Sequence, residues 1–121
     1  LQYLLKLKEL GIKIGLATSN SMHLLTTTLK SNNAFELFDA ITVTDEVEKS
    51  KSNPDIYLLA AKKLGVNPSE CMVFEDIIAA VYGAKLAGMK VTGVYDKHSE
   101  HQIDILKKEC DNYIYNYEDL I

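Results

Sequence analysis

Short apolar segments and helix-forming segments alternate along the whole of this 121-residue chain. The candidate strands are residues 13–17, 40–43, 71–74, 90–94 and 113–114. The candidate helices are residues 1–10, 21–31, 53–64, 77–87 and 99–110. Because two parallel strands need a long crossover connection, usually a helix, this alternation predicts a parallel sheet with helices on its faces. We therefore expect one Rossmann-like α/β domain with three layers, α/β/α.

The composition argues against several classes of protein. The net charge is −4 and the 13 basic residues form no block, which argues against a nucleic-acid partner. No apolar run approaches the length that spans a membrane. Neither a Gly-x-Gly-x-x-Gly fingerprint nor a phosphate-binding Gly-Lys-Ser/Thr loop is present. Of the two cysteines, Cys71 falls in a predicted buried strand, so we expect reduced thiols and a cytoplasmic protein.

The pair Glu75-Asp76 directly follows the candidate strand at residues 71–74 and precedes the candidate helix at residues 77–87. In a parallel α/β sheet this junction is the carboxyl end of a strand, where ligands bind. Two carboxylates there can hold Mg²⁺, which prefers oxygen ligands. The alternative role is structural, because an acidic residue at this junction also caps a helix.

Two further groups of polar residues stand at the ends of predicted elements. Thr18, with Ser19 and Asn20, follows the first candidate strand. A hydroxyl and successive backbone N–H groups can bind an anion there, or they can simply cap the next helix. Lys51 stands just before a Pro-Asp helix start. It can neutralise a phosphate or be a solvated loop residue, and Lys49 is a rival for the same role.

Several segments follow one another in an order that indicates a family. Residues 13–20 read KIGLATSN, and residues 51–61 read KSNPDIYLLAA. Residues 73–76 read VFED, followed by AKLAGM at residues 84–89, and residues 111–114 read DNYI. These resemble the second, third and fourth motifs and the closing strand of the haloacid dehalogenase superfamily of phosphohydrolases. Within it, the chain is most similar to phosphatases of the β-phosphoglucomutase type.

The resemblance implies a reaction and a cofactor. It implies transfer of a phosphoryl group from a small phosphorylated metabolite, such as a sugar phosphate, with Mg²⁺ as the cofactor. A family aspartate attacks the phosphoryl group, and water or a second hydroxyl then receives it, so both phosphatase and phosphomutase activity remain open. Asp76 would bind Mg²⁺ directly, and Glu75 would bind it directly or through water.

The resemblance also implies which residues hold the phosphoryl group. Thr18 would hydrogen-bond the phosphoryl oxygens, helped by the backbone at Ser19 and Asn20. Lys51 would stabilise negative charge on the nucleophile and on the phosphoryl group. These roles are electrostatic, and electrostatic stabilisation dominates phosphoryl transfer.

The chain departs from the family pattern in several places. The first motif, a strand ending in Asp-x-Asp that supplies the nucleophile and the general acid/base, is absent from all 121 residues, as is the helical cap domain that follows it. Ile77 and Ala80 stand where the fourth motif usually has Ser and Gly. Ser50 and Ser52 stand where the third motif often has Gly and Pro. We therefore expect residues 1–121 to be the C-terminal core portion of a longer enzyme and to be inactive alone.

Two other classes of protein compete with an enzyme. A degenerate, non-catalytic α/β binding domain would account for Ile77, Ala80 and the missing nucleophile, whereas Thr18, Lys51 and the acidic pair argue against it. A receiver-like signalling domain needs a phospho-accepting aspartate at a strand end. The acidic pair could imitate that feature, but the order of the other motifs fits a receiver less well.

The missing first motif has a structural consequence. In this family its strand lies between the strands at residues 13–17 and 71–74, so its absence leaves two inner edges without a partner. Unpaired buried backbone groups are costly, and exposed edges invite pairing with another chain. We expect a partner chain or a missing N-terminal segment to supply that strand, rather than direct pairing of residues 14–17 with residues 72–74.

Overall fold

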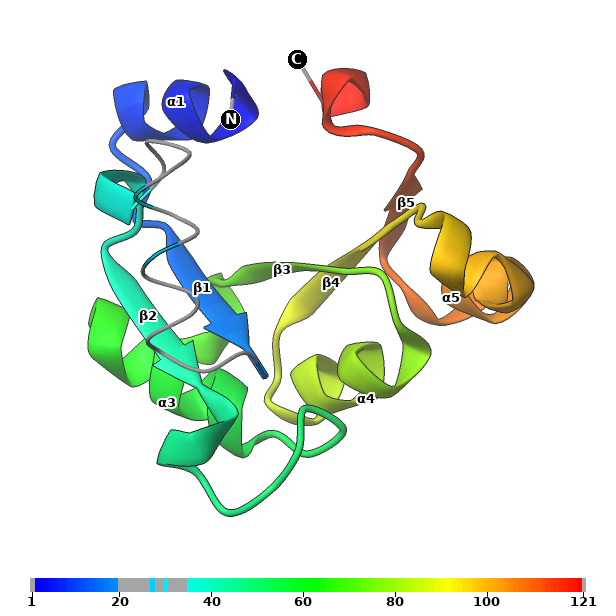
Figure 1. The fold of residues 1–121 in the computed structure, drawn as a ribbon, viewed down its shortest axis with the longest axis horizontal. Helices are drawn as coiled ribbons and strands as arrows, with labels where there is room; N and C mark the ends of the chain where they lie inside the picture. The colour runs from blue at the N-terminus through cyan, green and yellow to red at the C-terminus, as the bar shows by residue number, and fades with distance from the viewer. Residues whose placement is uncertain (1, 20–26, 28–29, 31–34, 121) are drawn as a thin grey trace.

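The computed structural model describes residues 2–19, 27, 30 and 35–120, shown in Figure 1. The strands are β1 (Gly15–Thr18), β2 (Ala40–Val43), β3 (Met72–Glu75), β4 (Lys90–Val94) and β5 (Asn112–Ile114). The α-helices are α1 (Gln2–Glu9), α3 (Asp55–Leu64), α4 (Ile78–Leu86) and α5 (Ile103–Glu109). Short 3₁₀ helices, η1 to η5, are Phe35–Leu37, Thr44–Glu46, Pro68–Glu70, Lys97–Gln102 and Tyr117–Leu120. Asn20 and most of the predicted helix at residues 21–31 lie outside the described residues.

The strands form two separate parallel sheets. β1 pairs with β2, and the second sheet has the order β3-β4-β5. Leu16 lies opposite Ile41 in the first sheet, and Val73 lies opposite Val91 in the second. Each of these pairings is parallel, which confirms the predicted α/β class. Within the described residues no ladder joins β1 to β3, so direct pairing, the outcome that we did not expect, does not occur.

The helices bury the apolar faces of the two sheets. α3 packs against β1 and β2, whereas α4 packs against β3 and β4 and also touches both α3 and α5 (Figure 1). The main core cluster consists of Ile56, Tyr57, Ala61, Val81, Ala84, Ala87, Met89, Val91 and Leu106. Truncating a side chain as buried as Leu106 to alanine costs about 2–5 kcal/mol. None of the described helices has the length and apolar character needed to cross a bilayer.

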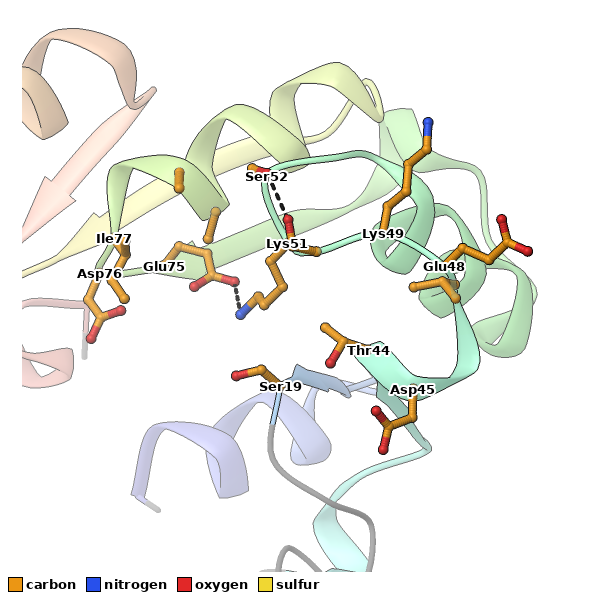
Figure 2. Close-up of a pocket in the computed structure, with 14 residues that line it drawn as sticks. Ser19, Thr44, Asp45, Glu48, Lys49, Lys51, Ser52, Glu75, Asp76 and Ile77 are labelled. Carbon is orange, nitrogen blue, oxygen red and sulfur yellow. Dashed lines mark hydrogen bonds and ion pairs between the residues drawn. The ribbon is translucent and has the colours of Figure 1, made fainter.

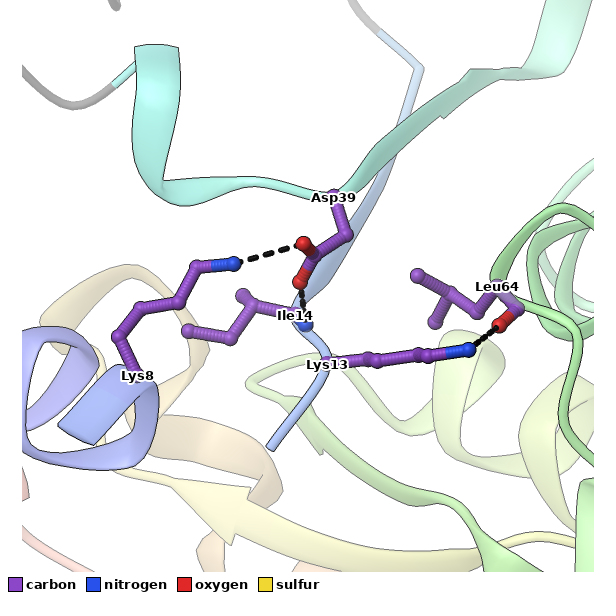
Figure 3. A network of polar contacts seen from close by, with 5 residues as sticks. All are labelled: Lys8, Lys13, Ile14, Asp39 and Leu64. Atoms are coloured by element: carbon purple, nitrogen blue, oxygen red, sulfur yellow. Dashed lines mark hydrogen bonds and ion pairs between the residues drawn. The ribbon is translucent and has the colours of Figure 1, made fainter. Parts of the chain in front are cut away.

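Strand β1 begins two residues later than the sequence pattern predicts, because Asp39 binds the backbone just before it. The Asp39 carboxylate accepts the Ile14 N–H at 2.7 Å, and the Asp39 N–H donates to the Ile14 carbonyl at 2.6 Å. Figure 3 shows this network, in which Lys8 Nζ also lies 2.7 Å from Asp39 Oδ1. Lys13 donates to the Leu64 carbonyl at 2.8 Å, at the end of α3. These contacts fix the first sheet to its neighbouring segments.

Glycines follow two of the helices. Gly65 follows α3 with a φ of 70°, and Gly88 follows α4 with a φ of 84°. This left-handed backbone is one that a residue with a Cβ rarely adopts. Both turns lead the chain back toward the next strand.

The amphipathic helix predicted at residues 99–110 is divided in two. Its first part is the 3₁₀ helix η4, which begins where the Asp96 carboxylate accepts the His98 N–H at 2.9 Å. Ser99, with φ −112° and ψ 17°, has non-helical geometry, and regular α-helix begins only at Ile103. The Asp96 side chain thus caps the start of the helical segment, and the break at Ser99 separates the 3₁₀ part from the α-helix.

Candidate active site

An open pocket of about 730 Å³ lies at the carboxyl ends of β1 and β3. Ser19 from the end of β1, Thr44 after β2, Lys51 before α3, and Glu75 and Asp76 at the end of β3 line it (Figure 2). In parallel α/β sheets the carboxyl ends of the strands lie at one edge, which is where ligands bind. The fold thus gathers the three predicted segments around one pocket.

Lys51 and Glu75 form an ion pair in this pocket. Lys51 Nζ lies 2.5 Å from Glu75 Oε2 (Figure 2). It also donates to the Ala17 carbonyl at 3.3 Å. The Glu75 side chain is only 9% exposed and that of Lys51 is 22% exposed, so water screens the pair weakly. A buried charge is tolerated when it is paired and hydrogen-bonded. One ammonium therefore connects the end of β1 to the end of β3, although no ladder joins those two strands among the described residues.

Tyr57 completes the surroundings of Glu75. Its hydroxyl donates to the same Oε2 atom at 2.7 Å. Burial, followed by the charge of Glu75 and the hydrogen bond to it, raises the pKa of Tyr57 far above its usual value, so the hydroxyl keeps its proton. Tyr57 was assigned no role from the sequence. The available signal was its place in the segment at residues 51–61, on the first turn of the helix that follows Lys51.

Asp76 has a different partner, the carboxyl group of Asp96. Burial and a hydrogen bond to Asp96 raise the pKa of Asp76. The pKa of Asp96 is lowered, first by the His98 N–H and then by Asp76. Asp96, which stands two residues past the end of β4, was not among the residues predicted from the sequence. Its position just beyond the end of a strand adjacent to β3 was the signal that could have identified it.

Aromatic rings flank this carboxyl pair. Asp76, Asp96, Phe74 and Tyr117 line a smaller pocket of about 380 Å³. The Tyr117 ring centroid lies 5.7 Å from that of Phe74 and 5.9 Å from that of Tyr3 in α1. The pKa of Tyr117 is raised by burial and then by the charges of Asp76 and Glu75.

The donor chemistry of Asp76 and Asp96 fits a divalent cation in part. Carboxylate oxygens are the ligands that Mg²⁺ prefers, and a cation would offset the repulsion between the two groups. Glu75 is engaged by Lys51 and Tyr57 instead. In the part of the chain that the structure describes, no group of three or more His, Cys, Asp or Glu side chains could hold a metal ion. A cation here would take most of its ligands from water or from a bound phosphate.

The remaining predicted residues are placed as follows. Thr18 is half-buried at the end of β1, and Ser19 is exposed and lines the larger pocket. Asn20 lies outside the described residues. Lys49 also lines the pocket, but its side chain points away from Glu75 in Figure 2. Of the two rival lysines, Lys51 is thus the one in contact with the acidic pair.

Comparison with protein families identifies the class of this fold. Residues 1–88 match the family model described as "Hydrolase: haloacid dehalogenase-like hydrolase". The chain belongs to this family. The match extends from α1 to the glycine that ends α4, so it includes Lys51 and both carboxylates of the acidic pair. The predicted membership of the haloacid dehalogenase superfamily is confirmed.

Three individual proteins illustrate what this haloacid dehalogenase-like chain is similar to. "Putative phosphatase YhcW" of Bacillus subtilis (strain 168) is 47% identical over 95 residues, which cover 78% of this chain and 43% of YhcW. A variant of CbbY from Rhodobacter sphaeroides, solved with xylulose-(1,5)bisphosphate, has a TM-score of 0.89 at 26% identity over 98% of this chain and 53% of that one. β-Phosphoglucomutase from Clostridium difficile has a TM-score of 0.81 at 27% identity, and the match covers 99% of this chain and 50% of that one.

These similarities fix the fold class and the extent of the match. The Rossmann-like α/β class is confirmed by the two solved structures. The chain spans about half the length of the relatives that it matches.

Proposed function

We propose that this chain is part of a Mg²⁺-dependent phosphatase that acts on a small phosphorylated metabolite such as a sugar phosphate. The observation that carries the proposal is the Lys51–Glu75 ion pair beside the Asp76–Asp96 carboxyl pair, at the carboxyl ends of β1, β3 and β4. The pocket offers both a cation for phosphate and oxygen donors for a metal. The similarity to YhcW, a putative phosphatase, supports the type of reaction, and the similarity to a CbbY structure that holds a sugar bisphosphate supports the class of substrate.

The phosphoryl group would lie between the ends of β1 and β3. The Thr18 hydroxyl and the backbone N–H groups of Ser19 and Asn20 would bind its oxygens. The Lys51 ammonium, held by Glu75 at 2.5 Å, would stabilise negative charge on the nucleophile and the phosphoryl group. Tyr57 would fix the Glu75 carboxylate and thereby the position of that ammonium.

Asp76 and Asp96 would hold the Mg²⁺ ion, with Glu75 taking part at most through water. When bound, the ion would neutralise charge on the phosphoryl oxygens. Without it, burial and the neighbouring Asp96 raise the pKa of Asp76, because two carboxylates in contact cannot both ionise easily.

The nucleophile would come from a strand that ends in Asp-x-Asp. In our proposal a segment preceding Leu1, or a partner chain, supplies this strand between β1 and β3, and a helical cap selects the substrate. Residues 1–121 alone would then bind phosphate weakly and turn over no substrate. Both cysteines are free and half-buried, and burial raises the pKa of each thiol, which suits the reducing cytoplasm that we propose for the protein.

A phosphomutase is the second candidate. It is favoured by the similarity to β-phosphoglucomutase, with which nearly the whole of this chain superposes. The two activities differ in the final acceptor, which is water for a phosphatase and a sugar hydroxyl for a mutase.

The test is phosphate release by the complete protein encoded with this chain. Inorganic phosphate is measured with a panel of hexose, pentose and hexitol phosphates, in Mg²⁺ and in EDTA. We expect Mg²⁺-dependent turnover by the complete protein, loss of it in Asp76→Asn, and none from residues 1–121. Steady turnover by residues 1–121 that Asp76→Asn abolishes would contradict the proposal. Conversion of a sugar phosphate to its isomer without release of phosphate would identify the mutase instead.

A further inference from the structure

A glycine in the interior of α4 is the least expected residue of the site region. Gly83 is buried in the middle of a helix, where glycine is the poorest choice other than proline. It is not required by the backbone, because its φ is not in the left-handed region. The reason for it must therefore lie in the space around it.

That space is filled by the backbone of the loop that carries Lys51. A Cβ added to Gly83 would lie 2.8 Å from the Asn53 carbonyl oxygen and 2.9 Å from the Lys51 carbonyl carbon, and it would collide with the Lys51 carbonyl oxygen. Real Cβ atoms do not make such contacts, and these neighbours are backbone atoms rather than the ends of flexible side chains. The helix and the loop therefore touch through their main chains.

The same loop and the same helix also meet at the site. Lys51 reaches Glu75 from the loop, and Glu75 lies just before α4 on the strand that leads into it. The separation between the Lys51 main chain and α4 thus sets how far its ammonium must extend to meet the carboxylate. Ala80, one turn before Gly83, is also buried and small and lines the pocket.

We propose that Gly83 is a positioning residue for Lys51. Because Gly83 has no side chain, α4 can pack directly against the backbone of residues 51–53. This holds the loop at the distance where the Lys51 ammonium contacts both the Ala17 carbonyl and Glu75. The inference extends the proposed function and rests on it for its kinetic consequence only. Any side chain at position 83 displaces the loop and, with it, the ammonium.

The first experiment measures the ammonium itself in residues 1–121. An ion-paired, half-buried lysine gives a ¹H–¹⁵N ammonium signal at low temperature, and Lys51→Arg identifies it by its loss. We expect Gly83→Ala to shift or abolish this signal. Gly88→Ala is the control at the end of the same helix, because Gly88 has a φ of 84° and an added Cβ would meet no atom within 4 Å, so the change strains the backbone without pressing on the Lys51 loop. The control should lose stability and keep the Lys51 signal. A folded Gly83→Ala protein with an unchanged signal would overturn the proposal.

A second measurement decides the matter if Gly83→Ala does not fold. In the wild-type chain, the Gly83 Hα protons should show nuclear Overhauser contacts to the residues from Lys51 to Asn53. Their absence would show that the main chains do not touch and would overturn the proposal without any variant.

The kinetic experiment uses the complete protein and separates this inference from the proposed function. Because a displacement of about 1 Å can cost on the order of a hundredfold in rate, we expect Gly83→Ala to lower kcat at least about tenfold with little change in KM. Adding Gly83→Ala to Lys51→Ala should cause almost no further loss. Turnover that is insensitive to Gly83→Ala would contradict the positioning role alone. Absence of phosphatase activity in the wild type, with the ammonium response intact, would contradict the proposed function alone.

Discussion

Glu75 and Asp76 are neighbours in sequence, but their surroundings are opposite. Glu75 faces a cation and a hydroxyl, Lys51 and Tyr57, which satisfy its charge. Asp76 faces a second carboxyl group, Asp96, which opposes its charge. The difference shows that one strand end can give two adjacent carboxylates different surroundings. In the function that we propose, Glu75 would hold the residue that binds phosphate, and Asp76 would lack a positive partner until a cation binds.

The largest effect should come from removing the cation on the Glu75 side. Lys51→Ala leaves Glu75, 9% exposed, without its counter-ion, so we expect the free energy of unfolding to fall by about 3 kcal/mol. Lys51→Arg should restore little, because a planar guanidinium does not replace a compact ammonium. Urea denaturation measures both changes.

The neighbouring lysine provides the control for that experiment. Lys49 is exposed and points away from Glu75, so Lys49→Ala should change stability by less than about 0.5 kcal/mol. In the complete protein, Lys51→Ala should likewise reduce turnover far more than Lys49→Ala. The reverse order of the two lysines would transfer the role to Lys49.

A smaller effect should follow from removing the hydroxyl that Glu75 accepts. Tyr57→Phe keeps the buried ring and deletes one hydrogen bond to a charged group, which is worth about 2 kcal/mol. Tyr82→Phe on the exposed face of α4, where the side chain is 40% exposed, should be close to neutral. Thermal and urea unfolding of the two variants test this. Equal losses would show that the Tyr57 hydroxyl does not stabilise Glu75.

The smallest effects should be on the pH dependence of stability, to which Asp39 and Asp76 should contribute with opposite signs. Lys8 and the Ile14 N–H lower the pKa of Asp39, so its stabilising contribution is present above about pH 3.9 and is lost as pH falls through the lowered pKa. Burial and Asp96 raise the pKa of Asp76, so the folded state binds the extra proton. The stabilising contribution of Asp76 is therefore lost as pH rises from about 3.9 through the raised pKa.

These opposite signs can be measured by comparing the free energy of unfolding of the wild type with that of two variants across the acid pH range. Relative to wild type, Asp39→Asn should become more destabilised as pH rises in the acid range, because the stabilising carboxylate of the wild type is then formed. Asp76→Asn should become relatively more stable over its own pH window, because it removes the repulsion with Asp96. If stability relative to wild type changed with pH in the same direction for both variants, the opposite environments of Asp39 and Asp76 would be contradicted.

The sequence predicted the location of a candidate site residue wherever that residue stands at the end of a strand or the start of a helix. Lys51, Glu75 and Asp76 each stand at a strand end or helix start, so their common location follows from the parallel sheet alone. Tyr57 and Asp96 could not be assigned in the same way. Their roles depend on which atoms face them from another element, namely Glu75 Oε2 and the Asp76 carboxyl group.

Contacts between residues distant in sequence also explain features that sequence patterns misplaced or left unexplained. The first strand starts late because Asp39, distant in sequence, binds the backbone of Ile14. The last helix is a local exception, because Asp96 begins a 3₁₀ turn and the non-helical geometry of Ser99 delays regular α-helix until Ile103. Gly83 is a second long-range example, since only the path of the Lys51 loop explains why a glycine stands inside α4. Local propensity cannot report such long-range contacts.

The most direct test of the contrast is a Mg²⁺ titration of residues 1–121, followed by the ¹³C signals of the side-chain carboxyl groups. We predict weak binding, with a Kd in the millimolar range or higher, because two carboxylates leave most ligand positions to water. The signals of Asp76 and Asp96 should shift together, and that of Glu75 should stay in place because Lys51 and Tyr57 hold it. Micromolar binding, or a titration in which Glu75 shifts and Asp96 does not, would contradict the account.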